Sequence, residues 1–86
     1  MDTMDVFYET LAAAQQAAHE GNLAILDSNL EILAKGTPGS KSEPEPVLAG
    51  LKMGLMSEAI LSYKRRTDHD KGIVAQYVAK YKISIN

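Results

Sequence analysis

Apolar side chains recur every three or four residues along most of the chain. In the first segment they are Met4, Phe7, Leu11, Ala14 and Ala18. This spacing places them on one face of an α-helix, whereas a half-buried strand would need an apolar residue at every second position. The spacing therefore predicts an all-α protein built from amphipathic helices.

Glycine, asparagine and proline divide this pattern into four segments, and we predict helices over residues 3–20, 23–35, 46–66 and 68–82. Residues 36–45 read Gly-Thr-Pro-Gly-Ser-Lys-Ser-Glu-Pro-Glu, a composition typical of a linker. Two boundaries stay open. The pair Gly21 and Asn22 suits a turn between two helices as well as a kink in one, and the third helix is able to continue through residues 67–70.

The length of the chain limits the fold to one domain. With 86 residues it is too short for two independent cores, and it has no cysteine for a stabilising disulfide. A hydrophobic content of 45% excludes wholesale disorder. We predict a single helical domain over residues 1–86: a helical hairpin or a three-to-four-helix bundle with one Pro/Gly-rich connecting loop.

The third predicted helix has apolar residues on more than one face, from Val47 and Leu48 to Tyr63, which predicts the central element of the bundle. Gly50 and Gly54 lie within it, and each costs about 1 kcal/mol of helix propensity relative to alanine. We expect a compensating gain, in which these glycines let the alanine-rich first helix approach closely.

The sequence contains a recognisable pattern at each end of the predicted fourth helix. Thr67 followed three residues later by Asp70 resembles a capping box at the start. After the helix, Tyr81, Ile83 and Ile85 alternate with polar residues, as in a short strand. This pattern is too short to predict a strand and indicates an adhesive tail.

Charge is unevenly distributed along the chain. Residues 1–46 carry eight carboxylates against two lysines, a charge of −6, whereas residues 64–86 carry six cations against two carboxylates, a charge of +4. The basic segment could bind an external anion, or it could attract the acidic half of the same chain or of another copy. Of these two hypotheses we favour the attraction within or between copies.

No motif indicates catalysis, a metal site or a cofactor, and we predict a protein that is not an enzyme. His19 and His69 are 50 positions apart, and Asp68, His69 and Asp70 suit the start of a helix better than a metal. Ser57 lacks the flanking glycines of a hydrolase nucleophile. No small-molecule substrate is implied.

We expect a protein–protein interaction or assembly module that acts through apolar helix faces and associates with itself. A rival hypothesis is nucleic-acid binding, because basic residues and tyrosines alternate in the C-terminal segment. The candidate interaction residues are the two glycines of the third helix and the polar residues of this segment: Gly50, Gly54, Lys64, Arg65, Arg66, Lys71, Tyr77, Lys80, Tyr81 and Lys82.

A family resemblance supplies a further alternative. Residues 30–61 contain a helix ending Leu33-Ala34-Lys35, a proline-bearing loop, and then Pro46-Val47-Leu48-Ala49 and Leu55-Met56-Ser57-Glu58. This third of the chain resembles the core of type III secretion needle subunits. The resemblance implies a helical hairpin that polymerises into a hollow filament.

The N-terminus is acidic rather than basic, and no apolar run follows it. We therefore predict neither a secretory signal peptide nor a membrane span, and a protein that is cytoplasmic as synthesised. Export by a route that needs no signal peptide is compatible with the same sequence.

Overall fold

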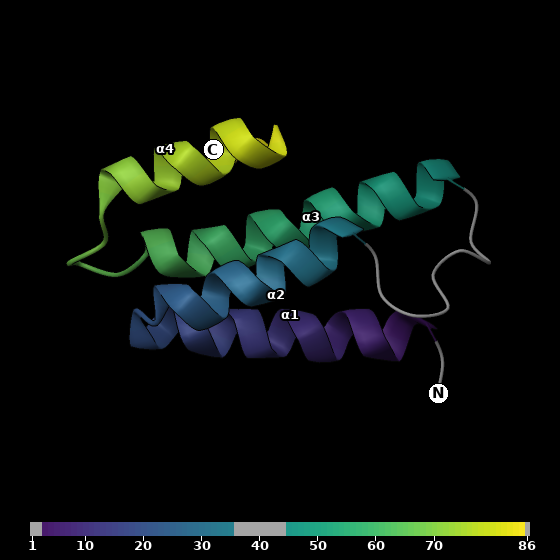
Figure 1. The fold of residues 1–86 in the computed structure, drawn as a ribbon, viewed down its shortest axis with the longest axis horizontal. Helices are drawn as coiled ribbons and strands as arrows, with labels where there is room; N and C mark the ends of the chain where they lie inside the picture. The colour runs from purple at the N-terminus through teal and green to yellow at the C-terminus, as the bar shows by residue number, and fades with distance from the viewer. Residues whose placement is uncertain (1–2, 36–44, 86) are drawn as a thin grey trace.

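The computed structural model describes residues 3–35 and 45–85, with side chains for residues 5–35 and 50–85. Within these residues the chain forms four helices and no strand: α1 (Thr3–Glu20), α2 (Leu23–Lys35), α3 (Glu45–Lys64) and α4 (Lys71–Tyr81). Figure 1 shows that all four lie roughly along the long axis of the molecule. The fold is a small all-α bundle. The predicted linker up to residue 44 and the side chains of Met4, Val47 and Leu48 lie outside the described residues.

The first 35 residues form two separate helices joined by a tight turn. Gly21 has a φ of 73°, which an L-residue adopts only at a cost. Its N–H donates to the carbonyl of Ala18 at 3.1 Å, and the N–H of Asn22 donates to that of Ala17 at 2.9 Å. These two bonds make a Schellman cap, and Asn22 then caps α2 by accepting from Ile25 N at 3.2 Å. The turn sends α2 back along α1.

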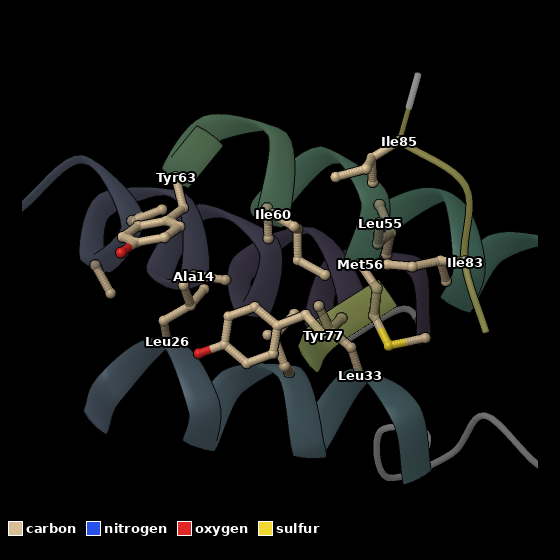
Figure 2. Packing of buried hydrophobic residues seen from close by; sticks show 14 of the residues in the cluster. Ala14, Leu26, Leu33, Leu55, Met56, Ile60, Tyr63, Tyr77, Ile83 and Ile85 are labelled. Carbon is tan, nitrogen blue, oxygen red and sulfur yellow. The ribbon is translucent and has the colours of Figure 1, made fainter. Parts of the chain in front are cut away.

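The core lies between α1, α2 and α3 and is closed by α4. α3 packs against each of the other three helices, which is the central position expected for it. Figure 2 shows side chains from all four helices and the C-terminal tail pointing into one interior. The largest fully buried side chains come from the first three helices: Phe7, Leu26, Leu30, Leu33 and Ile60.

α3 ends at Lys64, and a turn over residues 65–70 leads into α4, so the two helices are not continuous. α4 begins at Lys71, three residues later than predicted. The predicted capping role of Thr67 is wrong, because Asp70 is the N-cap and its carboxylate accepts from Gly72 N at 2.8 Å. The hydroxyl of Tyr63 accepts from Asp70 N at 2.8 Å and ties the start of α4 to the end of α3.

The chain continues past α4 as a short non-helical tail. Lys82 ends the helix in the left-handed conformation, with a φ of 54°. Ile83 and Ile85 then turn into the core, next to Leu55 and Met56 in Figure 2. These two isoleucines explain the alternation seen in the sequence, because an extended segment buries every second side chain.

Candidate interaction surface

The two glycines of α3 do not serve the packing that we expected of them. Gly50 and Gly54 are both exposed, and a Cβ atom built on either would meet no described atom within 4 Å. The predicted close approach of α1 at this point is therefore wrong. The small residues of α1 that enter the core, Ala14, Ala17 and Ala18, belong to the same buried cluster as larger side chains of the other helices.

Part of the basic segment pairs with the acidic half of the same chain. Lys80 Nζ lies 2.6 Å from Glu31 Oε1 on α2, and the Tyr81 hydroxyl donates to the same oxygen at 3.2 Å. The Tyr77 hydroxyl donates to Asp27, one turn earlier on α2. The bond from Lys80 lowers the pKa of the Glu31 carboxyl, while burial and then the bond to Asp27 raise the pKa of Tyr77. These contacts join α4 to α2.

Arg66 also acts inside the fold. Its Nη1 donates to the carbonyl of His19 in the last turn of α1. Its Nε and Nη2 each lie 3.0 Å from a carboxylate oxygen of Asp68, and this pairing lowers the pKa of the Asp68 carboxyl. A cation on the free carbonyls of a helix C-terminus also complements the helix dipole. Arg66 therefore fastens the α3–α4 turn to the end of α1.

The remaining cations are exposed but do not form one surface. Lys64, Arg65 and Lys71 lie around the α3–α4 turn, where Asp68 and Asp70 are also found. Lys82 lies eleven residues beyond Lys71, roughly 16 Å further along the helix. The tyrosines offer little stacking surface, since Tyr77 is buried and Tyr81 is half-buried.

α2 carries exposed apolar side chains in addition to those on its core face. Leu26, Leu30 and Leu33 take its core face, whereas Ile25 and Ile32 remain 49% and 44% exposed. Seven residues separate these two isoleucines, so they lie two turns apart on one line of the helix. In the sequence, this exposure is indicated by the fact that Ile25 and Ile32 fall outside the three- and four-residue spacing of the buried leucines.

Two of the polar residues between the two isoleucines, Ser28 and Asn29, are bonded to their own helix. Ser28 Oγ donates to the carbonyl of Ala24 at 3.1 Å, and Asn29 Nδ2 donates to that of Ile25 at 2.9 Å. Covering these side chains would therefore leave those donors satisfied. We name the residues Ile25, Ser28, Asn29 and Ile32 the α2 stripe.

A depression on the surface of α1 does not form an enclosed ligand site. A shallow depression of about 370 Å³ is lined by four residues that all come from α1: Asp5, Tyr8, Glu9 and Ala12. A single helix provides no facing wall to hold a small molecule. Within the described part of the chain, no three His, Cys, Asp or Glu side chains are placed to hold a metal ion.

No helix formed by the described residues is both long enough and apolar enough to cross a membrane. We also compared the chain with models of protein families, with curated proteins and with solved structures, and none of the three comparisons gave a match.

Proposed function

We propose that this chain is a non-enzymatic assembly module that associates with a second copy of itself through the α2 stripe. The observation that carries the proposal is the exposure of Ile25 and Ile32 two turns apart on α2. Seven-residue spacing of apolar side chains is the pattern by which helices pair lengthwise. A surface that pairs with itself forms a two-fold dimer in which each copy contributes the same residues.

Charge favours an antiparallel arrangement of the two α2 helices. In that arrangement Ile25 of one copy faces Ile32 of the other, with Ser28 and Asn29 near the two-fold axis. Lys35, at the C-terminal end of α2, then comes to the end of the partner's hairpin, where Glu20 is exposed. A parallel pair would place the two Lys35 residues side by side, and it would also align the two helix dipoles.

The size of the stripe sets the strength of the association. Two half-exposed isoleucines cover much less than the roughly 800 Å² per partner that a standard stable interface buries. We therefore expect reversible pairing that depends on protein concentration. Among residues 64–82, the cations that make no described ion pair are divided between the two ends of α4, so the structure offers the nucleic-acid hypothesis no comparable observation.

Size-exclusion chromatography with light scattering over a concentration series tests the proposal. The chain should shift from monomer to dimer as concentration rises. In protein that has not been unfolded and refolded, the double substitution Ile25→Glu with Ile32→Glu should leave a folded monomer throughout the series. Met53→Glu is the matched control, since Met53 is also 44% exposed but lies on α3. A wild-type monomer at every concentration would refute the proposal, and large polymers would favour the needle-like alternative instead.

A further inference from the structure

α4 and its tail are the most weakly buried part of the core. Their four buried side chains, Val74, Tyr77, Ile83 and Ile85, keep 5–9% exposure, whereas the largest fully buried residues all belong to the other three helices. The contacts between α2 and α4 involve the hydroxyls and ammonium group described above. α4 thus packs on α3 and is joined to α2 by polar and charged contacts.

The turn before α4 contains nothing that prevents it from becoming helical. Residues 65–70 read Arg-Arg-Thr-Asp-His-Asp, without proline or glycine. A helix continuous from residue 45 to residue 81 would be about 55 Å long. In such a helix Ile60 and Val74 are fourteen residues apart, as are Tyr63 and Tyr77, so all four stay on one face.

We propose that two copies of this chain exchange their α4 segments, each docking α4 and the tail on the α2–α3 surface of the other. The turn over residues 65–70 then straightens and joins α3 to α4 in one helix. Every contact of α4 with its own chain is replaced by the same contact with the partner, so the two forms differ mainly at the turn. This exchange does not use the α2 stripe, and it is independent of the function proposed above.

Side chains at the turn hold the closed, monomeric form. Arg66 bonds to His19 and Asp68, Tyr63 accepts from Asp70 N, and Asp70 caps α4. Straightening the turn gives up these bonds and gains main-chain hydrogen bonds across residues 65–70. The turn residues therefore set the ratio of exchanged dimer to closed monomer.

A cysteine pair distinguishes the two forms, since the chain has no cysteine of its own. Ser57 Oγ donates to the carbonyl of Ser84 at 3.3 Å, which places α3 against the tail. In the variant Ser57→Cys with Ser84→Cys, a disulfide that forms within one chain reports the monomer, and a disulfide that forms between two chains reports the exchanged dimer. It is made with Ile25→Glu and Ile32→Glu, so that association through the α2 stripe does not contribute.

The protein is unfolded, refolded at low and at high concentration, oxidised and examined on a non-reducing gel. We expect a covalent dimer that is restricted to the concentrated sample. Disulfides that close within single chains at every concentration would overturn the exchange without affecting the α2 proposal. A dimer that forms when Ile25 and Ile32 are retained, but not in this variant, would support the α2 proposal alone.

Two substitutions at the turn test the exchange without cysteines, by light scattering of the refolded protein. Arg66→Ala should raise the ratio of dimer to monomer about tenfold per chain, because a charged hydrogen bond of the closed form is lost. Thr67→Pro should abolish the dimer, since proline breaks the continuous helix. Thr67 N makes no main-chain hydrogen bond among the described residues, so the closed turn loses none there.

Thr67→Gly serves as a second variant if the proline prevents folding. It should lower the ratio of dimer to monomer about fivefold for each chain, because glycine has a low helix propensity. The straightened turn would be excluded by a dimer that persists in folded Thr67→Pro, by a dimer that Thr67→Gly does not diminish, or by a dimer-to-monomer ratio that Arg66→Ala leaves unchanged.

Discussion

The unit formed by α1, α2 and α3 differs from α4 in how it is held. The three-helix unit contains the fully buried Phe7, Leu26, Leu30, Leu33 and Ile60. α4 contributes two buried side chains, Val74 and Tyr77, that keep 7–9% exposure, and it is joined to α2 through hydroxyls and one ion pair. Burial of apolar area supplies most folding free energy, and exposed ion pairs supply little. The comparison predicts that α4 opens at a lower free energy than the rest of the molecule unfolds.

Core substitutions should separate the two regions most strongly. Leu30→Ala removes a fully buried side chain of α2 and should lower the free energy of unfolding by about 2–5 kcal/mol. Val74→Ala on α4 should cost roughly 1–2 kcal/mol and speed hydrogen exchange mainly in residues 71–85. Urea unfolding and native-state hydrogen exchange measure the two effects. Equal effects in all four helices would show that α4 is not a separate unit.

The two left-handed helix ends offer a sharper comparison, because one carries glycine and the other does not. Gly21→Ala should destabilise the protein by about 1–2 kcal/mol, and its Cβ would lie 3.0 Å from the Arg66 guanidinium carbon. Lys82→Gly removes the cost of the left-handed conformation at the end of α4 and should stabilise the protein by up to about 1 kcal/mol. Thermal and urea unfolding check both. If Gly21→Ala is neutral, the turn between α1 and α2 does not need a glycine in the left-handed conformation.

The polar attachment of α4 predicts a response to alkaline pH. The pKa of Tyr77 is raised in the folded protein, so its contribution to stability is complete below its ordinary pKa of about 10 and is lost as pH rises above it. Hydrogen exchange or fluorescence should show α4 loosening from pH 10 upward. Tyr77→Phe should weaken α4 by about 1 kcal/mol at neutral pH and reduce the alkaline effect.

Tyr81 also has a raised pKa, caused first by burial, so part of the alkaline effect should remain in Tyr77→Phe. Ile73→Val, also on α4 but without a titrating group, is the control and should keep the full pH dependence. Loosening that begins in α1 at the same pH would contradict the assignment to α4.

The smallest effect is expected at the glycines of α3, and it has the opposite sign. Gly54→Ala should stabilise the isolated chain by about 0.5–1 kcal/mol, because the added methyl group meets no described atom within 4 Å. Gly50→Ala should act alike, and a melting curve at low concentration measures both. A loss of stability would mean that another surface approaches these glycines.

The sequence predicted the all-α fold and the central place of α3, because both depend on the spacing of residues that are close along the chain. It misplaced the start of α4, since Thr67 and Asp70 are both good caps and only the hydrogen bonds at Asp70 and Tyr63 select between them. It also assigned the exposed glycines to a helix contact that does not form. Local spacing therefore shows which segments are helical more reliably than which residues those helices contact.

The sequence by itself determined four amphipathic segments, the two charged halves and the absence of any recognisable catalytic motif. Only the tertiary structure decided which charges are used inside the fold: Lys80 meets Glu31 across 49 positions, and Arg66 meets the carbonyl of His19 across 47. It also decided that Ile25 and Ile32 stay exposed. Helical periodicity arises from neighbours a few residues apart, whereas pairing and exposure depend on how helices distant in sequence pack together.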